Sequence, residues 1–125
     1  KIVMDATNPL LPGLAGLSIG TTTSGAEESA LLAPGAHFVK AFNTVGFNVM
    51  ANPAFPQGRA AMFYCGDDAA AKKTVAGLIE ELGFDAIDAG PLSQALVLEP
   101  MAMLWISLAG RYGYGREIAF QFMRR

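Results

Sequence analysis

Polar residues that could contact a small ligand follow two strand-like apolar runs. They are Thr7, Asn8 and Pro9 after the first run, and Asn43 and Thr44 after the second. An asparagine side chain offers one carbonyl acceptor and two amide donors, which suits a ligand that carries a carboxamide group. The fixed ring of Pro9 would give a rigid wall for a flat ring. The alternative is that Asn8 and Asn43 only form turns and cap helices, and both roles can coexist.

Three further side chains have candidate roles with a simpler alternative. Lys40 lies inside an apolar run, where it either contacts a cofactor or substrate phosphate or extends its ammonium to water from a strand edge. Cys65 is expected to be a buried, inert thiol. His37 precedes its strand, at the end away from the expected ligands, so a surface role is favoured.

Glu99 stands in the apolar run Leu92–Ala109 and needs a partner or a helix end to tolerate burial. If Pro100 begins a new helical segment, Glu99 lies at its N-terminus, where the helix dipole favours a carboxylate. A substrate-binding role is the alternative. No convincing acid–base pair, nucleophile or metal cluster is present in the sequence, so we predict no catalytic side chain and no metal.

Composition restricts the partners. Of the 125 residues 52% are apolar and 16% charged, against roughly 25% charged in an ordinary soluble domain. A net charge of −2 gives no electrostatic reason to expect nucleic acid or an anionic membrane surface. The single cysteine excludes an internal disulfide and suits a reducing compartment. We therefore expect a cytoplasmic protein with a small-molecule partner.

The pattern of apolar residues predicts an α/β protein whose first strands are parallel. Strands are expected at 1–6, 37–42, 60–65 and 85–89, and a last strand, or alternatively a short helix, at 117–123. Ser24 and Glu27 predict a capping box for a helix over 25–33. Asn43 and Thr44 are expected to cap a helix through Met50. A helix with the apolar stripe Val75, Leu78, Ile79 and Leu82 should start at Asp67 or Asp68 and end at Gly83.

The run 91–109 is expected to form a helix that is buried on nearly all sides, because no face of it is polar. Pro100 should kink or divide it. A membrane span is disfavoured, because Ser93, Gln94, Glu99 and Pro100 leave only Met101–Ala109 uninterrupted, against the roughly 20 residues that a bilayer needs. An alternative role for the segment 92–109 is a subunit interface, which would make the chain a non-catalytic assembly module.

The segments Asp5–Leu10 and Val39–Thr44 resemble the NADPH-dependent coenzyme F-420 reductase family. Its relatives include the reductase domains of the six-transmembrane epithelial antigen metalloreductases. The segments 66–68, 90–92 and 98–106 agree with the resemblance in the same order along the chain. In that family they follow a first half with a glycine-rich phosphate loop, and no strand–GxGxxG–helix unit occurs here.

The resemblance implies that residues 1–125 form a single α/β domain that lacks the first βαβ half. This domain would be the C-terminal portion of a Rossmann-like, doubly wound, mainly parallel sheet with helices on both faces. The chain begins almost directly with a strand, so we also expect a cut edge there.

The resemblance further implies an NADP-dependent oxidoreductase that transfers a hydride between NADP(H) and coenzyme F-420 or a flavin-like acceptor. It favours Thr7, Asn8, Pro9, Asn43 and Thr44 as cofactor-binding residues, and we assign substrate binding to Lys40, Pro100 and Met101. The family often has a basic residue where Ala95 and Leu96 stand, which weakens the transfer of an acidic substrate. A homodimer or higher homo-oligomer is expected, and a 125-residue chain alone should be inactive.

Overall fold

The computed structural model describes all 125 residues and contains a four-stranded sheet of order β1-β2-β5-β6. The strands are β1 (Ile2–Asp5), β2 (His37–Lys40), β5 (Ala61–Gly66) and β6 (Asp85–Asp88). The pairs β1–β2 and β5–β6 are parallel, whereas β2 and β5 are antiparallel and meet only over their last two residues. The expectation of a mainly parallel α/β sheet is confirmed. The carboxyl ends of three strands therefore converge.

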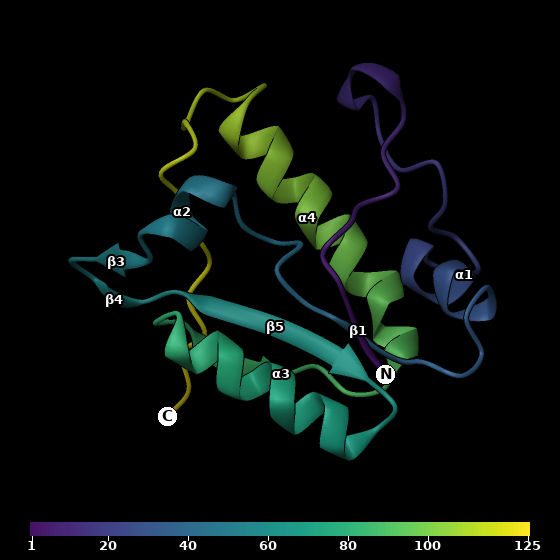
Figure 1. Cartoon of the computed structure of the whole chain (residues 1–125). Coiled ribbons are helices and arrows are strands. Elements are labelled where there is room, and N and C mark those ends of the chain that lie inside the picture. The colour runs from purple at the N-terminus through teal and green to yellow at the C-terminus, as the bar shows by residue number, and fades with distance from the viewer.

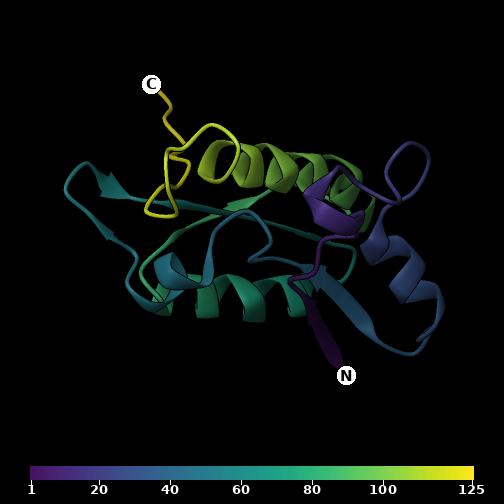
Figure 2. The ribbon, with the colours of Figure 1, turned by 90° about the horizontal axis from the view of Figure 1, so that it is seen from above.

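Helices cover both faces of the sheet (Figure 2). One face packs against α3 (Ala69–Glu81) and the other against α1 (Gly25–Leu31) and α4 (Ala95–Ala109). Because side chains alternate along a strand, Val39 faces α3, whereas its neighbours Phe38 and Lys40 point to the side of α1 and α4.

Side chains cap both well-predicted helices. Ser24 accepts from the Glu27 amide at 3.2 Å, while the Glu27 carboxylate accepts from the Ser24 amide at 3.0 Å, which confirms the capping box of α1. Asp68 caps α3 by accepting from the Ala71 amide at 2.7 Å. The buried stripe of α3 consists of Ala71, Val75 and Ile79, so Leu78 and Leu82 were wrongly placed in the core and are exposed.

Two local predictions for residues 43–59 were wrong or incomplete. Asn43 and Thr44 do not cap a helix, because α2 (Phe47–Ala51) begins after Gly46 and has no side-chain cap. The hairpin of β3 (Ala54–Phe55) and β4 (Gly58–Arg59) was not predicted, since its strands are too short to show an alternation of apolar residues.

The expected last element at 117–123 is absent. This segment is irregular and lies against the body of the protein through a few single bonds. The Ala61 amide donates to the Phe120 carbonyl at 2.8 Å, and the Trp105 indole donates to the Ile118 carbonyl at 2.8 Å. These two separate hydrogen bonds do not form the continuous series of backbone hydrogen bonds that a strand needs.

Helix α4 follows the short turn η2 (Leu92–Gln94) and continues through Pro100 without being divided. Burial on nearly all sides was wrong: Val97 and Leu104 are 59% and 52% exposed, and only the side with Leu98, Ala102 and Trp105 is buried. The stretch Leu92–Ala109 has a mean hydropathy of 1.4 and is long enough to span a membrane by length and composition, a property that core helices of soluble proteins share. The long segment between β1 and α1 contains a short 3-10 helix, η1 (Pro12–Leu14), and an isolated antiparallel bridge between Leu10 and Leu17 (Figure 1).

Candidate functional site

The two predicted asparagines meet at the carboxyl ends of β1 and β2. The Asn43 side-chain amide donates to Asn8 Oδ1 at 3.1 Å, and the Asn8 side-chain amide donates to the Asn43 carbonyl at 3.1 Å. The Asn43 amide also donates to the Leu98 carbonyl of α4 at 2.9 Å. Parallel pairing of β1 with β2 brings these ends to one rim of the sheet. Both residues therefore belong to one site, which we call the asparagine pair.

The backbone just before this pair is strained. Phe42 is buried and has a φ of +64°, a left-handed conformation that costs a bulky residue energy. Its amide donates to the Met62 sulfur at 3.2 Å. This conformation turns the chain sharply after β2, so that Asn43 and Thr44 are both buried beside the end of β1.

Two oxygens of this turn have no hydrogen-bond partner within the protein. Asn43 Oδ1 and Thr44 Oγ1 are buried and unpaired. A buried polar oxygen without a partner is unfavourable by about 1–3 kcal/mol, so such groups usually bind water or a ligand. These oxygens suit a ligand that presents N–H or O–H donors, and a nicotinamide carboxamide is one such group.

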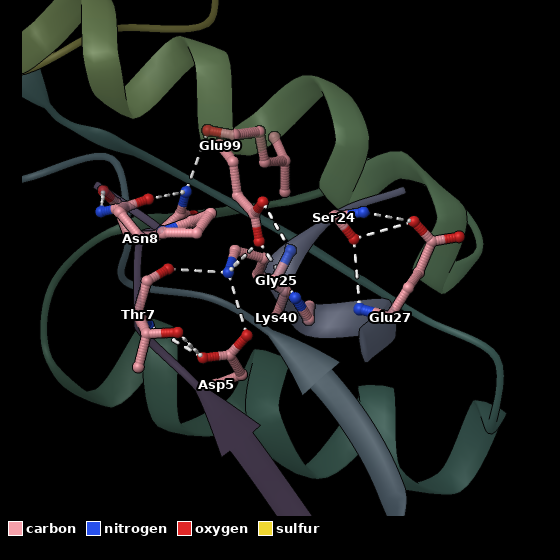
Figure 3. A network of polar contacts seen from close by, with 12 residues as sticks. Asp5, Thr7, Asn8, Ser24, Gly25, Glu27, Lys40 and Glu99 are labelled. Carbon is pink, nitrogen blue, oxygen red and sulfur yellow. Dashed lines mark hydrogen bonds and ion pairs between the residues drawn. The ribbon is translucent and has the colours of Figure 1, made fainter. Parts of the chain in front are cut away.

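Beneath the asparagine pair lies a cluster of buried charges (Figure 3). The Lys40 ammonium is 2.9 Å from Asp5 Oδ2 and 2.8 Å from Glu99 Oε1, and it donates to the Thr7 carbonyl at 2.7 Å. Both Lys40 and Glu99 are 0% exposed. We call these three residues, Asp5, Lys40 and Glu99, the charge cluster. The Lys40 ammonium thus donates hydrogen bonds to Asp5 and Thr7 and forms an ion pair with Glu99.

Neither role considered for Lys40 matches this arrangement. The ammonium does not reach water from a strand edge, because the side chain is fully buried. Its three donors point to Asp5, Glu99 and Thr7 rather than to a free phosphate position. Lys40 is therefore corrected from a substrate-binding residue to the centre of an internal ion cluster.

Glu99 is stabilised differently from the sequence expectation. It is the fifth residue of α4 rather than the start of a new helical segment. Its carboxylate accepts from the amides of Gly25 and Ala26 at 2.9 and 3.1 Å, so the helix N-terminus that favours it belongs to α1. A Cβ on Gly25 would lie 3.3 Å from Glu99 Oε1 and 3.2 Å from Pro9 Cγ, so a glycine suits this close contact.

Asp5, at the end of β1, accepts hydrogen bonds from Thr7 as well as from Lys40. Its Oδ1 accepts from the Thr7 amide at 2.9 Å and the Thr7 hydroxyl at 2.7 Å. Burial alone raises the pKa of Asp5, but the bonds from Thr7 and the Lys40 ammonium outweigh it and leave the pKa below its ordinary value. Asp5 thus binds Lys40 as a carboxylate.

The other residues predicted to bind the cofactor or the substrate differ in exposure and in what they contact. Thr7 is exposed and its hydroxyl donates a hydrogen bond to Asp5, whereas Pro9 packs beside the first turn of α1. Pro100 is exposed on α4, and Met101 packs against the core that contains Phe38 and Cys65. Neither Pro100 nor Met101 bonds to the pair, so their assignment to the substrate stays a prediction.

Cys65 and His37 lie apart from the proposed chemistry. Cys65 is fully buried, and burial, only partly opposed by the charges of Lys40 and Lys72, raises its pKa to about 12. This environment matches the expected inert thiol. His37 is at the opposite end of β2, exposed and 3.6 Å from Asp68.

Two of the known proteins similar to this chain are described as reductases. A solved structure from an Arthrobacter species, provisionally described as an F-420 dependent NADP reductase, matches 99% of this chain and 58% of its own chain, with a TM-score of 0.88 and 35% identity. The predicted resemblance to the NADPH-dependent coenzyme F-420 reductase family is confirmed. Its Rossmann-like fold is shared by this chain.

Two further proteins are similar to this chain. The metalloreductase STEAP3 of Rattus norvegicus is 32% identical over 104 residues, which are 82% of this chain and 20% of the rat protein. A hypothetical protein of Sinorhizobium meliloti is 36% identical with a TM-score of 0.68, over 76% of this chain and 47% of its own. No family model matches the sequence. The chain thus spans only part of the length of the relatives it matches, a fifth of one and just over half of another.

The partners of Lys40 were missed at the level of sequence, although a signal was present. Asp5, Lys40 and Glu99 are each a lone charge in an apolar run. Buried charges of opposite sign must pair, so three such residues in one small domain could have been assigned to one another. The Leu98 carbonyl gives no such signal, since every residue has one.

Proposed function

We propose that this chain forms the nicotinamide end of an NADP(H) site in a reductase, with the asparagine pair against the carboxamide of the ring. The observation that carries the proposal is the pair of unpartnered oxygens, Asn43 Oδ1 and Thr44 Oγ1, at the meeting point of the strand ends. A carboxamide N–H₂ has two donors and would satisfy both. In open α/β sheets ligands bind outside the carboxyl ends of the strands, which is where these atoms lie.

The cofactor, when bound, supplies the hydride, and the residues of this chain hold the ring and exclude water. Asn43 and Thr44 would orient the carboxamide and therefore the face of the ring that reacts. Pro9, packed beside α1, would limit the motion of the ring on one side. Thr7, close to the same rim, completes the proposed cofactor-binding group. Alignment of two reactants in this way can lower a barrier by about 7–11 kcal/mol.

We propose a flavin-like acceptor, with coenzyme F-420 as the first candidate. Support comes from the family resemblance and from the description of the Arthrobacter protein. Pro100 and Met101 of α4 stay our candidates for contact with this acceptor.

We further propose that the phosphate-binding part of the NADP(H) site comes from chain that pairs with β1. The outer edge of β1 is unpaired, and its residues Ile2 and Met4 are 45% and 46% exposed. An open edge with apolar side chains is unfavourable in water and favours a further strand. In this view residues 1–125 are the C-terminal part of one dinucleotide-binding domain.

The test is a rate measurement on the intact protein. Oxidation of NADPH, followed by absorbance, should occur with coenzyme F-420 or a flavin and should be slowed strongly by Asn43→Ala. The exposed variant Asn52→Ala is the matched control and should react like the wild type. NADPH binding without oxidation by any such acceptor would refute the reductase proposal, while an unaffected rate in Asn43→Ala would refute the placement of the ring.

We also propose a homodimer that forms through the outer face of α4. Val97, Pro100 and Leu104 are exposed along this helix, and its one charged residue, Glu99, is buried, so two copies could meet without charge repulsion. In sedimentation the intact protein should be a dimer, and Leu104→Glu should convert it to a monomer. A wild-type monomer at high concentration would exclude this assembly.

A further inference from the structure

We propose that the charge cluster is a positioning device for the asparagine pair, with Glu99 as its principal positioning residue. The cluster does not touch the proposed ring. Its bonds instead fix the end of β1, which carries Asn8, and the part of α4 whose Leu98 carbonyl accepts from Asn43. The catalytic meaning of this inference rests on the proposed function, but the positioning itself does not.

The first segment is the end of β1. Lys40 donates to the carbonyl of Thr7, which directly precedes Asn8, and Asp5 accepts from the amide and the hydroxyl of Thr7. The peptide that leads into Asn8 is thus held at its carbonyl and at the preceding amide. The cluster therefore restricts where Asn8 can place its side chain.

The second segment is the middle of α4. The Leu98 carbonyl accepts from the Asn43 side-chain amide at 2.9 Å, and Leu98 is the residue just before Glu99. Glu99 is held by the Gly25 and Ala26 amides and by Lys40. These three bonds fix the position of α4 along its axis, so they also fix the acceptor that orients Asn43.

The arrangement of charges in the cluster decides which substitution can test the positioning role without unfolding the protein. Two carboxylates face one ammonium, and the α1 amides stabilise the excess negative charge. Removal of Lys40 leaves two facing carboxylates, which endangers folding. Glu99→Gln instead leaves Lys40 paired with Asp5. The side-chain NH₂ of the glutamine then faces the N–H of Gly25. Because both groups are hydrogen-bond donors, α4 should move away from α1 at this point.

The direct test is NMR of the Asn43 side-chain amide in the intact, ligand-free protein. Glu99→Gln should speed hydrogen exchange of this group by about tenfold and shift its resonances, while the backbone amides of α3 keep their wild-type exchange rates. Glu27→Gln is the matched control, because it removes one carboxylate from the same end of α1, keeps a residue that suits a capping box and does not touch Lys40. It should leave the Asn43 signals unchanged.

If Glu99→Gln does not fold, Glu99→Asp serves in its place. It keeps the charge but is too short to reach Lys40 and both α1 amides at once, so the same change of smaller size is expected. Unchanged Asn43 signals in the folded variant would overturn the inference. Equal acceleration of the Asn43 group and of the α3 amides would also overturn it, because that result shows a general loss of stability only.

A binding measurement connects the device to the proposed function. Glu99→Gln should weaken NADPH binding about three- to tenfold and leave the binding of adenosine 2′,5′-bisphosphate, which has no nicotinamide, unchanged. Equal weakening of both ligands, or of neither, would overturn the positioning role in binding. Failure of the wild-type protein to bind NADPH would refute the proposed function instead, and the NMR result would still decide the positioning itself.

Discussion

The side-chain amide of Asn43 donates to the side-chain oxygen of Asn8 over 3.1 Å, although 35 residues separate the two in the chain. The reciprocal bond from the Asn8 amide to the Asn43 carbonyl closes a two-bond link between the ends of β1 and β2. In this link the side-chain amide of Asn43 is fully used, while its side-chain oxygen has no hydrogen-bond partner in the protein. The same residue thus connects the two strand ends and keeps one buried oxygen unpaired.

Asn43→Ala should destabilise the ligand-free protein by about 1–3 kcal/mol, because Asn8 Oδ1 and the Leu98 carbonyl each lose the donor that Asn43 provides. Urea unfolding followed by circular dichroism measures this difference. Asn52→Ala changes the same residue type at an exposed position and should stay within about 0.5 kcal/mol of the wild type. Equal stabilities for the two variants would show that the asparagine link contributes nothing.

Asp5 should make the stability fall in acid. Its folded-state pKa is below the ordinary value of 3.8, so its contribution is complete above that value and is lost as the pH falls through the lower folded-state pKa. Asp5→Asn should be less stable than the wild type near neutral pH by about 1–3 kcal/mol. The difference should shrink as the pH is lowered below 3.8.

The measurement is urea unfolding of both proteins at a series of pH values. Asp85→Asn is the control, because Asp85 is paired only with the exposed Arg59 at 3.5 Å and an exposed pair contributes about 0–1 kcal/mol. A difference between wild type and Asp5→Asn that is constant down to the acid transition would contradict the role assigned to the Asp5 carboxylate.

Cys65 should react very slowly with a water-soluble aromatic disulfide in the native protein. With a pKa of about 12, its thiolate fraction near pH 8 is on the order of 10⁻⁴, against about a quarter for a free thiol of pKa ~8.5. Reaction should therefore be about a thousandfold slower or more than in the protein unfolded by urea, which is the internal control. A native rate within tenfold of the unfolded rate would show that the thiol is accessible.

Two glycine-to-alanine changes should have opposite signs. A Cβ on Gly46 would lie 2.9 Å from Trp105 Cη2 and 2.5 Å from Asn48 Oδ1, so Gly46→Ala should destabilise by about 1–3 kcal/mol through overpacking. Gly77 lies inside α3 with open space around its Cβ position, so Gly77→Ala should stabilise by about 0.5–1 kcal/mol. Thermal unfolding of the two variants against wild type measures both. Stabilisation by Gly46→Ala would contradict the close packing of Trp105 against Gly46, and destabilisation by Gly77→Ala would contradict the open space at Gly77.

Much of the fold could be predicted because local patterns determine it. The four sheet strands and the capping box of α1 depend on short runs of residues. The direction of β5 relative to β2 could not be read in this way. β2 and β5 pair over only two residues each, and this pairing is a tertiary contact between segments that are remote in the sequence.

The candidate site was predictable in its asparagines and not in its charges. Asn8 and Asn43 follow strands, so topology alone brings them to one rim. Lys40 was misinterpreted because its partners are remote in sequence, and Glu99 because its helix N-terminus belongs to α1. The outer face of α4 was wrongly predicted to be buried, because the sequence does not show which segments pack against this helix. An apolar composition shows which residues avoid water, but not how much neighbouring protein is present to cover them.

The charge cluster also restricts the order in which the chain can fold. Its bonds connect residues that are 35 and 74 positions apart, whereas β5, α3 and β6 are consecutive and form a short-range unit. Closure of long loops is slow, and an ammonium that loses its hydration before both carboxylates arrive is strongly disfavoured. We therefore expect Lys40 to stay hydrated until β1, α1 and α4 have all assembled, so that its burial is a late step of folding.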